Sequence, residues 1–302
     1  MNNKFKILYG CSSFDSIKIL DKYKNIKNIY VGFYDEESEK KWPVIFNTIN
    51  RRGDYASFYG LEQFSKLDEE AIKRNISVYV TFNIPYKKSQ MDWIINAVCK
   101  ISEFSSVKGI IVGDINLLLI LKKFSYKKDI VISTSGTNFN DYAIEFYAGL
   151  GAKRFILDRQ LTAKEIVLTL QKYPEYEYEV FLVLTTGCLF VDGYCSSGHT
   201  NTKTTCGALI SKYGEKLVRS PYKCNICLLY YLIKFNNVSI KIANRGISSS
   251  EFRIDTILTL ERVLNKKNID FKKFQNYCKK ILKKHLNIEC NHKVCLCRDL
   301  YE

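Results

Sequence analysis

The chain has 302 residues, of which 46% are hydrophobic, and its formal net charge is +15. This composition allows one full-sized core. No apolar run is long enough for a signal peptide or a membrane span, so we expect a cytoplasmic protein with no membrane partner. The charge permits a polyanionic partner such as RNA. The Lys residues are spread along the chain rather than clustered, so the charge alone does not decide for nucleic acid.

Apolar strand-like runs alternate with amphipathic helical stretches, which is typical of parallel strands joined by helical crossovers. The strands are expected at Phe5–Tyr9, Asn28–Phe33, Ser77–Asn83, Gly109–Asp114, Ile130–Thr134, Arg154–Asp158, Glu179–Leu184 and Ser239–Ala243. The helices are expected at Asp15–Lys22, Leu61–Arg74, Gln90–Glu103, Ile115–Phe124, Ala143–Leu150, Thr162–Leu170, Cys227–Phe235 and Glu251–Lys266. Eight such units predict an α/β fold of the (β/α)8 barrel type. An open doubly wound sheet is the alternative, but no glycine fingerprint follows the first strand.

We expect a single domain over residues 1–302, with the barrel in 1–270 and a C-terminal helix and cysteine tail in 271–302. Two connections, Tyr34–Gly60 and Thr185–Lys223, are too long for simple turns. Loops of that length in a compact domain are usually functional. Both leave the carboxyl end of a strand, which is the face where barrel enzymes keep their active sites.

Eleven cysteines, an odd number, disfavour a closed disulfide framework, and a reducing compartment would not sustain one. Eight of them gather in two places, and these are Cys188, Cys195, Cys206, Cys224 and Cys227, then Cys290, Cys295 and Cys297. In a barrel the end of the seventh strand and the start of the next helix lie on the same face. The first five thiols are therefore expected to converge there.

Thiolates in this pattern point to a metal or cluster site. Iron–sulfur clusters use four cysteines of irregular spacing, which favours the set Cys188, Cys195, Cys206 and Cys227. Zinc prefers paired C-x2–4-C knuckles, and we find that form only at Cys224/Cys227, so zinc is the alternative. Structural thiols without a metal are the third reading. His199 and His292 could substitute as ligands or lie beside them.

The tail segment ECNHKVCLC adds three thiols, and with Cys224 they permit a second cluster. Equally, the tail thiols could cap the first site or clamp the C-terminus. Cys99 and Cys278 lie in helical segments and are expected to be ordinary packing positions. Cys11 ends the first strand, where a site role is open.

A series of segments, taken in order, resembles the collagenase-like peptidase family U32 over nearly the whole chain. NRRGDYASF (Asn50–Phe58) is similar to the family's Asn-Arg-Arg segment, and ISTSGTNFN (Ile132–Asn140) is similar to its fifth unit. GAKRFILDRQLTAKEI (Gly151–Ile166) is close to the family signature, except that Gln160 replaces the usual Glu. SIKIANRG (Ser239–Gly246) stands where the family has Lys-Ile-x-Gly-Arg.

The resemblance implies a barrel fold and a 4Fe–4S cluster held by four cysteines. Cys188 and Cys195 match the first two positions at the family's spacing, Cys206 lies closer to Cys195 than the third position usually does, and either Cys224 or Cys227 matches the fourth. Members of the family assist oxygen-independent hydroxylation of tRNA, ribosomal RNA or ubiquinone precursors, with prephenate as an oxygen donor. Other members carry the collagenase label. The departures suggest a divergent subgroup.

Three functions follow as alternatives: an Fe–S hydroxylase acting on an RNA base or a small aromatic, a U32-type peptidase, and a non-catalytic Fe–S subunit that partners a paralogous U32 chain. Proteolysis is poorly supported, because only three His occur and no protease motif is present. Polar residues at strand ends are expected to surround the barrel mouth and bind substrate, namely Asn50, Arg51, Asn83, Asp114, Arg159 and Arg245. Their arginines could hold an anionic co-substrate such as prephenate by bidentate hydrogen bonds.

Overall fold

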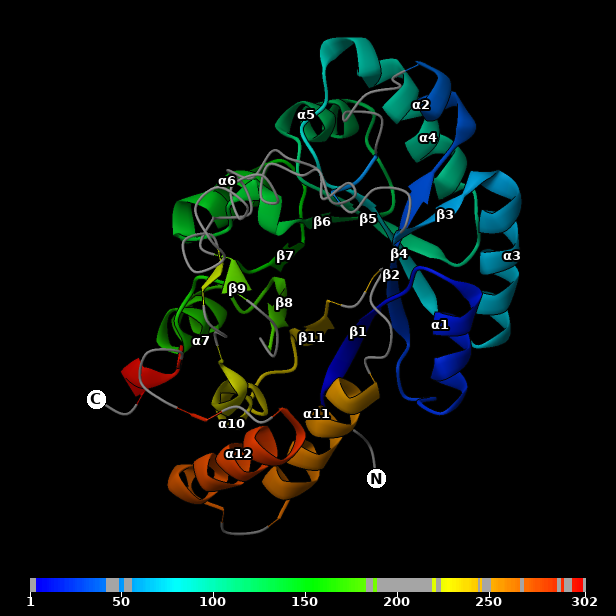
Figure 1. Cartoon of the computed structure of the whole chain (residues 1–302). Helices are drawn as coiled ribbons and strands as arrows, with labels where there is room; N and C mark the ends of the chain where they lie inside the picture. Colours follow the sequence, from blue (N-terminus) through cyan, green and yellow to red (C-terminus); the bar gives the residue numbers. More distant parts are fainter. Residues whose placement is uncertain are drawn as a thin grey trace.

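The computed structural model describes residues 4–41, 49–51, 56–182, 187–188, 219–220, 224–243, 245, 251–266, 269–286, 289–290 and 295–300. Eight parallel strands close into a barrel, which confirms the predicted fold (Figure 1). These strands are β1 (Lys6–Gly10), β2 (Asn28–Tyr34), β4 (Ser77–Phe82), β5 (Val107–Val112), β6 (Asp129–Ile132), β7 (Arg154–Ile156), β8 (Glu177–Phe181) and β11 (Val238–Ile242). The barrel closes because β1 pairs in parallel with both β11 and β2, so the open-sheet alternative is wrong.

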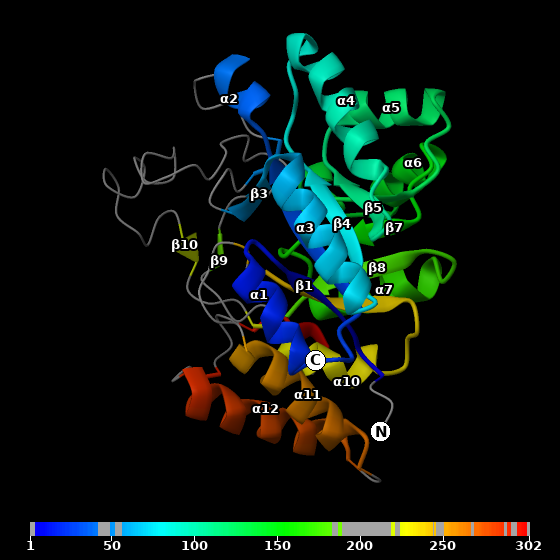
Figure 2. The ribbon, with the colours of Figure 1, turned by 90° about the vertical axis from the view of Figure 1, so that its right-hand side faces the viewer.

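Helices follow the strands and form an outer layer around the barrel (Figures 1 and 2). They are α1 (Phe14–Lys18), α3 (Gly60–Lys73), α4 (Met91–Ser102), α5 (Ile115–Lys123), α6 (Asp141–Gly149), α7 (Ala163–Lys172), α10 (Leu229–Leu232) and α11 (Glu251–Leu264). Their start signals are local: Thr162 caps α7 through a reciprocal capping box with Glu165. The helix expected at Cys227–Phe235 is shorter than predicted, because its first turn, Ile226–Leu228, is a 3-10 turn.

The connection Tyr34–Gly60 contains two elements that periodicity did not predict. A short helix, α2 (Glu36–Lys41), has no apolar residue, so it has no apolar stripe to detect. A three-residue strand, β3 (Ser57–Tyr59), pairs in parallel with β2 outside the barrel closure. Gly32 on β2 permits this approach, because a Cβ there would lie 2.3 Å from Ser57 Oγ and 2.7 Å from Arg245 Nη1.

The remaining elements lie at the C-terminal end and in the second long connection. The strands β9 (Gly187–Cys188) and β10 (Arg219–Ser220) pair antiparallel. The C-terminal helix that the sequence predicted after the barrel is α12 (Phe271–Leu286), and it lies beside α11 in both views (Figures 1 and 2). No helix within the described ranges is long and apolar enough to cross a membrane.

Side chains of alternate strand residues point to opposite faces, and this divides the core into two clusters. The larger cluster fills the layer between strands and helices and includes Ile7, Val31 and Ile242. The smaller cluster comes from the opposite parity and fills the barrel interior, with Leu8, Tyr30, Tyr79, Ile111, Val131 and Ile156. Charged residues share that interior parity on β8 and β11.

Candidate functional site

Four of the predicted site residues follow the carboxyl ends of barrel strands. Asn83 follows β4, Asp114 follows β5, Arg159 follows β7 and Arg245 follows β11. Parallel strands place all of these positions on one face of the barrel. Asn50 and Arg51 join them through hydrogen bonds with Arg245 and Asn83, and substrate binding by this group stays a prediction.

Arg245 is the centre of this network. It is buried, and its Nη1 donates to Thr81 Oγ1 at 3.0 Å, to Asn50 Oδ1 at 3.4 Å and to the Ala56 carbonyl at 3.4 Å. Its guanidinium carbon also lies 5.3 Å from the centre of the Tyr30 ring. The guanidinium therefore holds the end of β11 against the connection after β2, at the base of the barrel mouth.

The amides of Asn50 and Asn83 extend the network around the mouth. Asn50 is fully buried and its Nδ2 donates to Ser57 Oγ at 2.9 Å. Asn83 Oδ1 accepts from the backbone N–H of Arg51 at 3.2 Å, and its Nδ2 donates to Ser133 Oγ at 3.4 Å. Asn83 thus links the loop after β2 to the loop after β6.

Arg159 is the least buried of the predicted arginines and lies beside a buried carboxylate. Asp158 is 3% exposed, and its Oδ1 accepts from the backbone N–H of Gln160 at 2.8 Å. Arg159 itself is intermediate in exposure, in contrast to the buried Arg51 and Arg245. A partly accessible guanidinium at this face could bind a carboxylate or phosphate through two parallel hydrogen bonds.

Sequence reasoning missed a buried ion pair inside the barrel. Lys241 Nζ lies 2.7 Å from Glu179 Oε2 and 3.7 Å from the centre of the Tyr30 ring. Burial lowers the pKa of Lys241 to about 8, although the Glu179 carboxylate opposes the shift. The signal was available, because Lys241 and Glu179 share the inward parity of their strands.

Lys241 and Arg245 both lie near the Tyr30 ring. Arg154 lies near Glu179, the carboxylate that pairs with Lys241. Arg154 Nη1 lies 3.8 Å from Glu179 Oε1, and its Nε donates to Glu177 Oε2 at 2.7 Å. A column of alternating charges therefore runs through the barrel interior beneath the predicted substrate-binding residues.

Of the predicted metal ligands, the structure describes the side chains of five. Cys195 and Cys206, with His199 and His292, lie outside the described residues, and only the backbone of Cys188 is described, in β9. Asn225 Nδ2 donates to the carbonyl of Phe181, the last residue of β8, at 2.8 Å. This contact places Cys224 and Cys227 at the carboxyl end of β8, on the face predicted for them.

Six thiols from three separate segments interact with one another, and we call them the tail thiol group: Cys224, Cys227, Cys278, Cys290, Cys295 and Cys297. The Cys227 thiol raises the pKa of Cys278, and the Cys295 thiol raises the pKa of both Cys290 and Cys297, so these sulfurs lie near one another. Burial raises the pKa of Cys224 to about 12, and neighbouring thiols add to the shift. No three Cys, His, Asp or Glu side chains in the described part of the chain are gathered as a bound metal ion would require.

Three cysteines lie outside the predicted ligand set, and they differ in burial and in the groups that they contact. Cys99 is exposed on α4, so its expected packing role is wrong: the buried face of this helix carries Trp93, Ala97 and Ile101 instead. Cys278 is buried as expected, but it packs against another thiol. Cys11 is buried with its Sγ 3.1 Å from Ser16 Oγ, and burial raises its pKa to about 11.

Comparison with known proteins identifies the family. The family model of peptidase family U32 matches residues 23–294. The chain belongs to peptidase family U32. It is 26% identical over 136 residues to tRNA hydroxylation protein P of Haemophilus influenzae, a match that covers 45% of this chain. The chain spans only 29% of the length of that relative in the match.

A solved structure supports the fold of this U32 chain. The U32 peptidase Mk0906 superposes with a TM-score of 0.52 at 14% sequence identity, covering 80% of this chain and 93% of that one. At this identity the likeness shows the shared fold alone. It agrees with the closed barrel of parallel strands found here.

One residue that was predicted to bind substrate, Asp114, stabilises the local backbone instead of facing an open site. Asp114 is buried, and its Oδ1 accepts from the backbone N–H of Leu117 at 2.8 Å, which caps α5. Its Oδ2 accepts from the backbone N–H of Tyr86 at 3.2 Å. Both carboxylate oxygens are therefore engaged by the backbone.

Replacing Asp114 by Ala is expected to destabilise the fold by about 2 kcal/mol, because it removes a cap and leaves a buried N–H unpaired. Asn140→Ala is the matched control, since Asn140 Oδ1 caps α6 at an exposed position through the Ala143 N–H at 3.0 Å. That variant should lose about 1 kcal/mol. Urea unfolding of both proteins measures the difference, and equal stability of Asp114→Ala and wild type would contradict the structural role.

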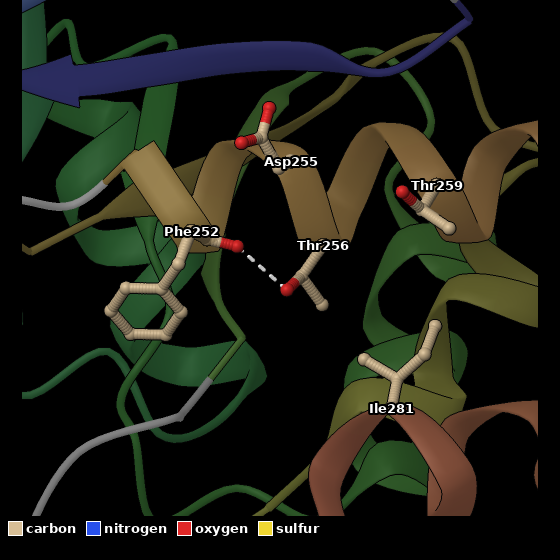
Figure 3. A pocket seen from close by; sticks show the side chains of 5 residues that line it. All are labelled: Phe252, Asp255, Thr256, Thr259 and Ile281. Atoms are coloured by element: carbon tan, nitrogen blue, oxygen red, sulfur yellow. Dashed lines mark hydrogen bonds between the residues drawn. The ribbon is translucent and has the colours of Figure 1, made fainter. Parts of the chain in front are cut away.

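The described residues also line a small cavity of about 140 Å³ between α11 and α12 (Figure 3). Two of the polar side chains that line it have partners: Thr256 Oγ1 donates to the Phe252 carbonyl at 2.6 Å, and Asp255 Oδ1 accepts from Tyr23 OH at 2.9 Å. None of the predicted site residues lines it, so it is separate from the barrel mouth.

Proposed function

We propose that this U32 chain takes part in oxygen-independent hydroxylation of an RNA base and carries a 4Fe–4S cluster on Cys188, Cys195, Cys206 and Cys227. Family membership carries the proposal, together with the relative named as a tRNA hydroxylation protein. The net charge of +15 supports an RNA substrate, because basic proteins attract the phosphate backbone.

The surroundings of one proposed ligand, Cys227, suit such a cluster. Cys227 is 5% exposed and lies at the carboxyl end of β8, and thiolates in a dry site are the ligands that Fe–S clusters use. When bound, the cluster would supply one-electron transfer. The other three cysteines enter the proposal from sequence spacing alone.

The side chains of the mouth would orient an anionic co-substrate. Arg159, a half-buried residue at this face, would bind a carboxylate, while Arg245 keeps Asn50 and the loop after β2 in place. A small carboxylate such as prephenate fits this charge pattern. Lys241, beneath the mouth, adds positive charge to the barrel interior.

Mass spectrometry of tRNA and ribosomal RNA nucleosides from a deletion strain tests the proposal. We expect one hydroxylated nucleoside to be lost and its precursor, lighter by one oxygen atom, to accumulate. Unchanged nucleosides with altered quinones or peptides would move the activity to a small aromatic or to a U32-type peptidase. If all three classes were unchanged, the chain would instead be a partner subunit of a paralogue.

A further inference from the structure

The helix α12 concentrates positive charge on its exposed side. Six of its 16 residues are Lys, and it contains no Asp or Glu. All six are exposed, and we call them the lysine face: Lys272, Lys273, Lys279, Lys280, Lys283 and Lys284. Positions seven and eleven residues apart lie on the same side of an α-helix, so these lysines form two parallel rows along its length.

The opposite side of α12 is fixed to the rest of the protein. Phe274, Cys278 and Leu282, each four residues from the next, are buried and belong to the larger core cluster. The helix lies on the outside of α11, at the edge of the molecule (Figures 1 and 2). The lysine face is therefore presented to solvent on a support that its own apolar side anchors.

Helix stability does not explain these lysines. Lys272 and Lys273 lie in the first turn, where the helix dipole disfavours positive charge. Lys279 lies four residues before Lys283, the following pair of positions repeats this spacing, and like charges so spaced destabilise a helix. The charges thus cost the helix stability, which indicates that they serve an interaction.

The helix α3 shows the arrangement that an ordinary solvated face has. Both of its lysines form ion pairs within the helix, Lys66 with Glu62 at 2.8 Å and Lys73 with Glu70 at 2.9 Å. On α12 only the exposed pairs Lys273–Asp270 and Lys283–Glu289 occur, and both acids lie outside the helix.

The other four members of the lysine face form no ion pair in the described part of the chain: Lys272, Lys279, Lys280 and Lys284. An anionic partner would therefore meet ammonium groups that no carboxylate of the described residues neutralises. The row from Lys272 to Lys283 is roughly 16 Å long at about 1.5 Å per residue. About five successive phosphates of a duplex strand, at roughly 3.4 Å each, have that length.

The fold directs this face toward the barrel mouth. The helix α11 begins after the carboxyl end of β11, and α12 returns beside it after a short connection, so the C-terminal end of α12 lies on the mouth side. The tail that follows agrees with this direction, because Cys295 pairs with Cys224 near the carboxyl end of β8.

We propose that the lysine face docks RNA by its phosphate backbone, without sequence preference, and leads it to the barrel mouth. The choice of RNA as the polyanion rests on the proposed function. A membrane fits less well, because helices that bind anionic lipid insert their apolar side, and that of α12 is buried. Tyr277, 43% exposed beside the rows, offers a ring on which an unpaired base could stack.

Binding of a fluorescent tRNA transcript to the full-length protein tests this surface without any turnover. The variant Lys272→Gln/Lys279→Gln/Lys280→Gln/Lys284→Gln should bind at least tenfold more weakly, to order of magnitude, because about four phosphate contacts are lost. For the same reason, the slope of the logarithm of the binding constant against the logarithm of salt concentration should fall by about 3.

The matched control removes the same charge from exposed lysines on other parts of the chain, as Lys24→Gln/Lys100→Gln/Lys127→Gln/Lys153→Gln. It should bind within about twofold of wild type, since only long-range attraction changes. Equal weakening of the two variants, or absence of tRNA binding by wild type, would overturn the proposal. So would loss of binding to phosphatidylserine vesicles by the first variant with its tRNA binding unchanged, which would assign the face to a membrane.

Two measurements keep this surface separate from the folding of the variants and from the hydroxylation. In wild type, tRNA should protect Lys279 and Lys280 from acetylation, and equal acetylation with and without tRNA would contradict docking there. Binding that depends on the lysine face, with unchanged nucleosides in a deletion strain, would refute hydroxylation and retain the surface. A lost nucleoside, with binding that ignores the lysine face, would do the reverse.

Discussion

Lys241→Met is expected to lower the free energy of unfolding by about 3–5 kcal/mol, because it leaves the Glu179 carboxylate buried without its partner. Glu179 is completely buried, and its Oε1 accepts no hydrogen bond. The remaining cation, Arg154, is 3.8 Å away and already hydrogen bonded to Glu177. At 3.8 Å it is too far to form the hydrogen bond that Lys241 makes at 2.7 Å.

The double variant Glu179→Met/Lys241→Met is the control for this prediction. It removes both charges at similar volume, so most of the lost stability should return, since a well-packed apolar pair is often as stable as a buried ion pair. Urea unfolding of the three proteins gives the comparison. A single variant as stable as wild type would show that the pair is not buried as described.

The lowered pKa of Lys241 predicts that the free energy of unfolding rises with pH over a defined window. The pKa of Lys241 is about 8 in the folded protein, below its ordinary value of 10.5 in the unfolded chain. Between these values the unfolded state binds a proton that the folded state lacks, so this group raises stability as pH increases from about 8 to 10.5. Lys241→Met should lack this increment, which unfolding measured across the window would detect.

The barrel was predictable because its strands are short apolar runs of regular spacing, such as Asn28–Phe33, and helix starts such as Thr162 carry local capping signals. The inward charges were also readable, since Lys241 breaks an apolar alternation on β11. Long-range contacts were not readable. The proximity of Cys278 to Cys227 depends on how α12 packs against the turn Ile226–Leu228, and no local pattern encodes that arrangement.

The residues predicted to bind substrate show the same limit of prediction from local sequence. Its residues could be placed at the strand ends from the sequence, but not sorted by role. Asp114 caps a helix, Arg245 is buried among loop and strand oxygens, and Arg159 is more accessible. Burial and hydrogen-bond partners distinguish these cases, and neither quantity is local in sequence.

Cys195→Ser is expected to remove most of the iron and acid-labile sulfide from protein purified without oxygen. Wild type should contain about four irons per chain and show the absorption and EPR signals of a 4Fe–4S cluster, and a missing thiolate leaves one iron without its protein ligand. Cys99→Ser should match wild type, because its side chain is exposed and outside the proposed set. Zinc as the only metal in all three proteins would contradict the cluster.

The most direct test joins the cluster to the reaction. A deletion strain is complemented with wild type, Cys195→Ser or Cys99→Ser at equal protein levels, and its RNA nucleosides are analysed by mass spectrometry. Cluster-dependent hydroxylation predicts that wild type and Cys99→Ser restore the hydroxylated nucleoside, whereas Cys195→Ser leaves the unmodified precursor. Full restoration by Cys195→Ser, or no nucleoside change in the deletion strain itself, would contradict it.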